Sequence, residues 1–147
     1  GLRVDGIFEE KNMGMDVFGK QPSADCGRYF RASIWMWAPL LEHMHASCRD
    51  LLSEDLLESL SYNDGKGPDD QATCTELADG FERGLAQYPS GFELESDDVR
   101  VNAEGRFVLC DPAEPKPEKT VSPFRIAGEE IARSIAFLRH CGGFAVW

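Results

Sequence analysis

Residues 27–40 read GRYFRASIWMWAPL, and this segment decides the fold because it limits where the first long helix begins. Proline is favoured in the first turn of a helix and disfavoured further inside. Pro39 therefore predicts a helix that begins near Ala38, preceded by an extended segment. Side chains alternate along an extended chain, so Trp35 and Trp37 are expected to share one face.

Two interpretations of this segment stay open. It is either an aromatic core whose arginine side chains reach to the surface, or a pocket or interface, because Trp, Tyr and Arg are enriched at binding hot spots. Two exposed indoles so close together would form an apolar patch. A second copy of the chain could cover such a patch, so two exposed indoles would predict a homodimer. The candidate binding residues are Tyr29, Arg31, Trp35, Trp37, Asn63 and Asp64.

Three long stretches and one short stretch carry apolar residues at helical spacing. Ser53 is the expected N-cap of the short helix, and Ser122 or Pro123 is expected to open the last helix. Gly80 and Gly84 lie one turn apart in the third of the four stretches. Each costs roughly 1 kcal/mol relative to alanine in a helix interior, so they predict a close approach by another element. The buried ridge of the last helix is expected to consist of Ile131, Ile135 and Leu138.

Strand patterns lie between and beyond these helices. MDVFG (residues 15–19) alternates apolar and polar residues, residues 99–109 read as a hairpin around an Asn102–Gly105 turn, and GFAVW closes the chain as a strand or packed tail. The predicted fold is a single α+β domain over residues 1–147, with residues 1–12 as an N-terminal extension or an expression remnant. Three main helices and one short helix pack on a small, largely antiparallel sheet.

The composition narrows the class of partner. The 147 residues include 26 acidic and 15 basic side chains, for a formal net charge of −11. This balance argues against direct nucleic-acid binding, which needs clustered Lys and Arg. Two explanations of the negative charge stay open: it attracts a basic partner, or it only keeps the protein in solution. A weaker alternative is an acidic mimic of nucleic acid, which would need its carboxylates on one face.

The cysteines and the N-terminal sequence indicate a compartment. The five cysteines include no C-x-x-C pair, so free thiols in a reducing environment are expected. No signal-peptide pattern and no run near the ~18 apolar residues of a membrane span are found. We therefore expect a cytoplasmic protein with no membrane partner.

Metal and cofactor motifs are not found in the sequence. His43, His45 and Cys48 are possible metal ligands, but two helical residues that are two positions apart point about 200° away from each other. No phosphate-binding, dinucleotide-binding, nucleophile-elbow or zinc-protease motif occurs. We predict neither a metal, nor a cofactor, nor a catalytic residue.

The alternative function is a small enzyme. Its pocket would lie near Arg31, Trp35, Asn63 and Asp64, with the carboxylate of Asp64 as the one plausible general base. A deep polar pocket would favour this enzyme, whereas an exposed aromatic patch would favour a non-enzymatic binding or accessory protein. The partner of that binding protein would be an unknown protein or small molecule.

MGMDVFGKQPSADCGRYFRASIWMWAPL (residues 13–40) resembles the start of a family of small, uncharacterised bacterial and phage proteins, which open MGxDV[YF]GKxP and continue through YFR to W-x-P-L. The turn at Asn63-Asp64-Gly65 and the C-terminal helix followed by Gly-Gly-Phe are similar to that family too. The resemblance implies cargo of mobile DNA, such as an integron cassette or a prophage gene, and no known activity. Some members have paired cysteines that suggest a zinc knuckle, and this chain has none at the corresponding place.

Overall fold

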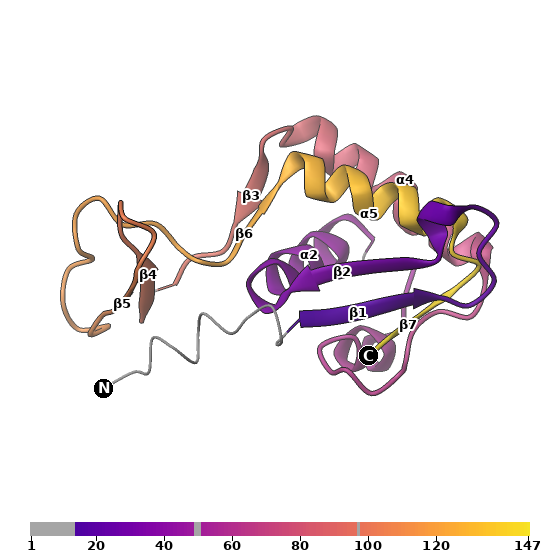
Figure 1. Ribbon diagram of the computed structural model, residues 1–147, viewed down its shortest axis with the longest axis horizontal. Coiled ribbons are helices and arrows are strands. Elements are labelled where there is room, and N and C mark those ends of the chain that lie inside the picture. The colour runs from indigo at the N-terminus through magenta and orange to yellow at the C-terminus, as the bar shows by residue number, and fades with distance from the viewer. Residues whose placement is uncertain (1–13, 49–50, 97) are drawn as a thin grey trace.

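The computed structural model describes residues 14–48, 51–96 and 98–147 of the chain. In chain order the elements are β1 (Gly14–Gly19), a 3-10 turn (Asp25–Gly27), β2 (Tyr29–Ser33), α2 (Ile34–Ser47), α3 (Glu54–Ser59), α4 (Gln71–Gln87), β3 (Gly91–Glu93), β4 (Val99–Val101), β5 (Phe107–Leu109), β6 (Arg125–Ala127), α5 (Gly128–His140) and β7 (Phe144–Val146). The predicted α+β class is confirmed, with three long helices and one short helix among the described residues, packed with small antiparallel sheets (Figure 1).

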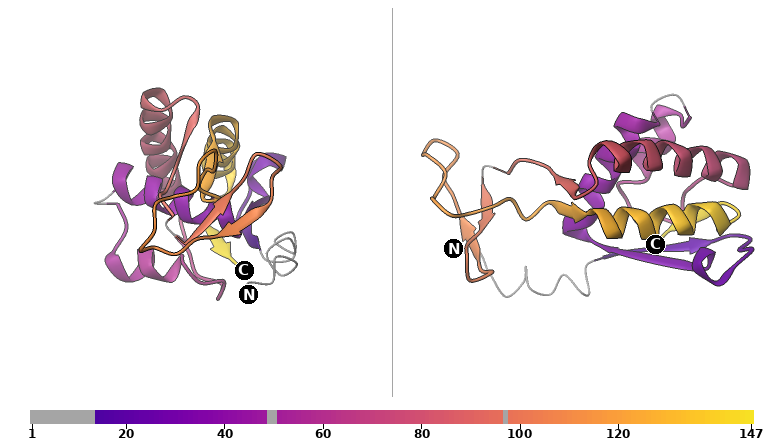
Figure 2. Two further views of the ribbon diagram at one scale, coloured as in Figure 1. Left: turned by 90° about the vertical axis from the view of Figure 1, so that its left-hand side faces the viewer. Right: turned by 90° about the horizontal axis from the view of Figure 1, so that it is seen from above.

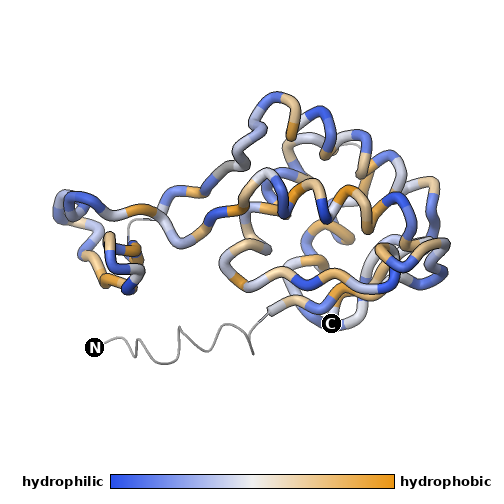
Figure 3. Tube along the Cα trace, turned by 45° about the horizontal axis from the view of Figure 1, so that its top comes forward, coloured by the Kyte–Doolittle hydropathy of each residue, from blue (hydrophilic) through white to orange (hydrophobic). Residues whose placement is uncertain are grey.

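The main sheet has the strand order β2-β1-β7, and both of its pairings are antiparallel. Figure 2 shows α4 and α5 side by side, with β1 and β2 running along the same side of this helix pair. Strand residues that face the helices belong to one apolar core: Val17, Phe30, Ala32, Phe144 and Val146. Along α4 and α5, hydrophobic and hydrophilic residues alternate in Figure 3, because each of these helices buries one face.

Helix α2 begins at Ile34, so the prediction of a start near Ala38 is wrong. The hydroxyl of Ser33 caps the helix by accepting a hydrogen bond from the Met36 amide at 3.3 Å. Pro39 consequently lies inside the helix, where it has no N–H to donate to the Trp35 carbonyl. The extended segment ends at Ser33, so Trp35 and Trp37 point to different sides of a helix rather than to one face.

Helix α5 begins at Gly128, so the prediction that Ser122 or Pro123 opens the last helix is also wrong. The intervening residues form β6, which pairs antiparallel with β3. The hydroxyl of Ser122 donates to the Leu94 carbonyl at 2.5 Å and accepts from the Phe124 amide at 3.1 Å. These bonds hold residues 122–124 in an extended conformation that leads into β6, so α5 begins only after β6 has paired with β3. The predicted ridge is confirmed, since Ile131, Ile135 and Leu138 are buried.

Helices α2 and α4 cross in close contact at the two glycines. A Cβ on Gly80 would overlap with the Cys48 sulfur and lie 3.1 Å from the Ser47 carbonyl oxygen. A Cβ on Gly84 would overlap with Cε1 of His43 and lie 2.7 Å from its Nε2. The predicted close approach is confirmed, and its partner is α2.

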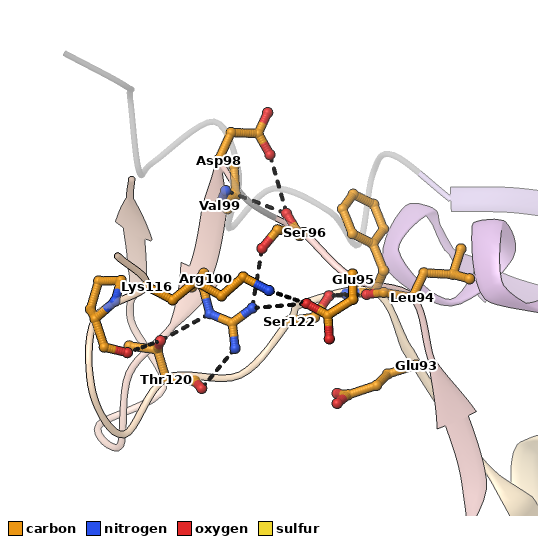
Figure 4. A network of polar contacts seen from close by, with 12 residues as sticks. Glu93, Leu94, Glu95, Ser96, Asp98, Val99, Arg100, Lys116, Thr120 and Ser122 are labelled. Atoms are coloured by element: carbon orange, nitrogen blue, oxygen red, sulfur yellow. Dashed lines mark hydrogen bonds and ion pairs between the residues drawn. The ribbon is translucent and has the colours of Figure 1, made fainter. Parts of the chain in front are cut away.

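Residues 94–96 and 98–122 form an arm that extends from the body beyond β3 and β6 (Figure 1). It contains the predicted hairpin, in which β4 pairs antiparallel with β5. The nearly buried guanidinium of Arg100 donates to the Ser96 carbonyl at 3.1 Å, and to the carbonyl and hydroxyl of Thr120 at 2.9 Å each (Figure 4). Glu95 lies beside Arg100 and pairs with Lys116. The arm is thus organised around a hydrogen-bonded cation.

Candidate binding site

A largely apolar groove lies between α2 and the turn after α3. Its volume is about 570 Å³, within the range of roughly 300–1,000 Å³ that ligand pockets span. We call it the Trp37 groove, and it is lined by Gly14, Met15, Ile34, Trp37, Ala38, Leu41, Ser61, Tyr62, Asn63 and Phe124.

The indole of Trp37 fixes the floor of this groove. Only 6% of Trp37 is exposed, and its Nε1 donates a 2.9 Å hydrogen bond to the Leu60 carbonyl. Because buried polar groups are costly unless they are paired, this bond determines how the turn after α3 packs against α2. The groove is therefore preformed rather than dependent on a mobile side chain.

The rim of the Trp37 groove is apolar and open to solvent. Ile34 is 42% exposed and Tyr62 is 60% exposed. Ser61 and Asn63 add polar groups on the turn side. Exposed apolar side chains that gather around a concave surface are typical of binding sites, so the arrangement can take an apolar group and orient it by a few hydrogen bonds.

Tyr29 and Arg31 lie on the open face of the sheet, where they meet Asp16. Asp16 is opposite Arg31 in the register of β1 and β2. Arg31 Nη1 donates to Asp16 Oδ1 at 2.6 Å, and the Tyr29 hydroxyl donates to the same oxygen. The hydrogen bonds from Tyr29 and Arg31 hold the pKa of the Asp16 carboxyl below its usual value. The same carboxylate raises the pKa of the Tyr29 hydroxyl. This triad is a hydrogen-bonded cross-strand contact beside the exposed Phe18 ring, which lies 5.1 Å from Tyr29.

Trp35 joins the arm to the body. Its ring centroid lies 5.2 Å from that of Phe107 on β5 and 5.0 Å from that of Phe124. Its Nε1 is buried and makes no hydrogen bond to any residue of the described ranges. Trp35 is not part of the described lining of the Trp37 groove, whereas Phe124, which contacts the Trp35 ring, is part of it.

The four residues of the hypothetical enzyme pocket are dispersed. Asn63 lines the Trp37 groove, whereas Arg31, Trp35 and Asp64 do not belong to the described lining of that groove. Asp64 is exposed, and its carboxylate lies 4.0 Å from the Lys66 ammonium. Arg31 instead contacts a carboxylate on the sheet, and Trp35 contacts aromatic rings at the base of the arm.

The condition behind the homodimer prediction is not met, because Trp37 is buried and the two indoles do not form one exposed patch. Among the metal-ligand candidates, His45 is exposed while His43 and Cys48 are buried. Within residues 14–48, 51–96 and 98–147, no three His, Cys, Asp or Glu side chains gather as a metal site would require.

Sequence reasoning missed most of the groove wall. Ile34, Leu41, Tyr62 and Phe124 were not among the candidates, although Tyr62 directly precedes the strong turn signal at Asn63. An apolar aromatic side chain next to a turn is a weak signal by itself. The groove forms where α2 packs against that turn, and the two segments are far apart in the sequence. A local sequence pattern does not predict such packing.

Comparisons with known proteins returned no matching family model, and neither a curated protein nor a solved structure showed significant similarity to this chain. The resemblance to the bacterial and phage family therefore stays a prediction. Across the described residues, no helix combines the length and the apolar character needed to cross a bilayer.

Proposed function

We propose that this chain is a non-enzymatic binding protein whose Trp37 groove takes an apolar segment of a partner protein. The observation that carries the proposal is a groove of about 570 Å³ with an anchored tryptophan floor and the exposed side chains of Ile34 and Tyr62 at its rim. A preformed apolar surface with aromatic anchors is the usual centre of a binding interface.

A protein segment fits this groove better than a small polar substrate does. The lining offers few polar groups to orient a small molecule, and it carries no charged side chain. The net charge of −11 favours a segment with basic residues beside its apolar anchor, since opposite charges accelerate association. The accessory role implied by the family resemblance is compatible with such a module and is part of the proposal.

Peptide selection tests the proposal directly. Peptides selected from a random display library on the wild-type chain are expected to carry apolar anchors with basic flanks. The affinity of the selected peptides is then measured for the wild-type chain and for two variants. Ile34→Asp changes the rim of the groove, and Leu109→Asp is the control, at an apolar residue of the arm that is 51% exposed. Ile34→Asp is expected to weaken binding at least tenfold, because a hot-spot contact contributes about 2 kcal/mol.

Two results would contradict the proposal. One is a selection that yields no peptide above background, and the other is equal binding to the two variants. Light scattering on the wild-type chain adds a check on a second copy as the occupant. If the wild-type chain is a dimer and Ile34→Asp makes it a monomer, the occupant of the Trp37 groove is a second copy of the chain and not a partner protein.

A further inference from the structure

A second groove lies on the other side of α2, where α2 crosses α4. Its volume is about 450 Å³, and we call it the His43 groove. Its lining consists of Glu42, His43, Ala46, Ser47, Gly80, Arg83, Gly84, Gln87 and Tyr88. It shares no lining residue with the Trp37 groove, so a role for the His43 groove is independent of the function proposed for the other.

The two walls of this groove carry opposite charges. Glu42 belongs to α2 and Arg83 to α4, and both side chains are exposed. The Glu42 carboxylate and the Arg83 guanidinium are more than 4.0 Å apart, so they form no ion pair with each other. Among the described residues, neither forms an ion pair with another side chain, and the nearby Arg139 pairs with Asp79 and Glu82 instead. Arg83 Nη2 lies only 3.5 Å from the position that a Cβ on Gly80 would occupy, so the guanidinium is close to the groove floor.

The floor is small and uncharged. Gly80 and Gly84 carry no side chain, so the His43 ring of α2 and the sulfur of Cys48, the residue that caps α2, lie directly against α4 at the bottom of the groove. His43 is 5% exposed, and its ring stands edge-on to Phe81 with centroids 4.9 Å apart. Burial lowers the pKa of this imidazole, and the Phe81 carbonyl lies 3.4 Å from its Nε2. At neutral pH the charge in the groove thus comes from Glu42 and Arg83.

We propose that the His43 groove binds a small zwitterion with a carboxylate at one end and an ammonium group at the other, such as an amino acid. The guanidinium of Arg83 would bind the carboxylate, and the carboxylate of Glu42 would bind the ammonium. A simple anion is repelled by Glu42 and a simple cation by Arg83, whereas a zwitterion is attracted by both walls. The aliphatic stem spans the groove between the two walls, where Gln87 adds a further amide donor.

A length series of ω-amino acids, from glycine to 6-aminohexanoate, tests the proposal by titration into the isotope-labelled chain. We expect saturable shifts of the Ala46, Gly80 and Gly84 amide signals, strongest for the length that spans the two walls. Butyrate and butylamine each carry one charge of γ-aminobutyrate. Both are expected to bind at least tenfold more weakly than the best zwitterion, because a charge-assisted hydrogen bond is lost.

Two substitutions that each neutralise one charge test whether Arg83 and Glu42 bind the zwitterion. Arg83→Gln and Glu42→Gln each remove one exposed charge and are expected to weaken zwitterion binding at least tenfold. The matched controls Arg106→Gln and Glu104→Gln lie in the exposed turn of the arm and are expected to leave binding unchanged. The proposal is overturned if no member of the series shifts these signals, if butyrate binds as tightly as the zwitterions, or if the two groove variants bind like the wild type.

Discussion

Gly84→Ala is the sharpest test of how α2 packs on α4. On helix propensity alone the change would stabilise α4 by roughly 1 kcal/mol. The new methyl group would however overlap with Cε1 of His43 and lie 2.7 Å from its Nε2. Overpacking of this kind costs about 1–3 kcal/mol. The imidazole is buried against Phe81 and has little room to move, which places the cost near the upper limit. We expect a net loss of roughly 2 kcal/mol in the free energy of unfolding.

Urea unfolding followed by far-UV circular dichroism measures this loss, and two further variants separate its terms. Ala86→Gly, at an exposed position of the same helix, measures the propensity term and is expected to cost about 1 kcal/mol. In a His43→Ala background the clash is removed, so Gly84→Ala is expected to stabilise the chain. This sign reversal is the coupling that a double-mutant cycle detects. If Gly84→Ala stabilised the otherwise wild-type chain by about 1 kcal/mol, the close crossing of α2 and α4 would be refuted.

Further predictions concern the tryptophans, the buried histidine and the thiols. Trp37→Ala is expected to cost about 3–5 kcal/mol in thermal or urea unfolding, as a buried indole does; a loss below about 1 kcal/mol would contradict the anchored floor. Trp35→Ala should instead leave the melting of the body largely unchanged and make the arm more sensitive to limited proteolysis, and equal protease resistance would count against its role as the link. Because burial lowers the pKa of His43, the stabilising effect of its neutral form is complete above pH ~6.5 and is lost as the pH falls below that value. His43→Gln should therefore lose less stability than the wild type between pH 7 and pH 5, and parallel curves would disprove the assignment. Alkylation of denatured, unreduced protein should label all five cysteines, which are free in the structure, whereas mass spectrometry that finds three or fewer labels would reveal a disulfide.

Local signals in the sequence predicted much of the secondary structure. Ser53 caps α3 as expected, since its hydroxyl accepts from the Leu56 amide at 3.1 Å. The hairpin of β4 and β5 also follows from its own residues, because Asn102 and Gly105 supply the turn. Gly80 and Gly84 correctly indicated a helix crossing, since two glycines one turn apart have a cost that only a close neighbour explains.

The errors arose where two local signals competed or where a distant segment decided. Ser33 and Pro39 both favour the start of a helix, and the cap at Ser33 prevails. Strand β6 forms because β3 pairs with it from about thirty residues away along the chain. The candidate site was predicted in part: Trp37 and Asn63 do share one groove, but Trp35 does not, since an α-helix turns the two indoles apart.

The pairing of β3 with β6 makes the arm an insertion in topological terms. Glu93 lies opposite Arg125, and the Leu94 amide donates to the Phe124 carbonyl at 2.9 Å. The chain thus leaves the body and returns to it at neighbouring positions. A two-residue Asn-Gly turn could join the two strands in place of the arm. The length and sequence of the arm can therefore change over evolution while the register of the strands beneath it stays the same.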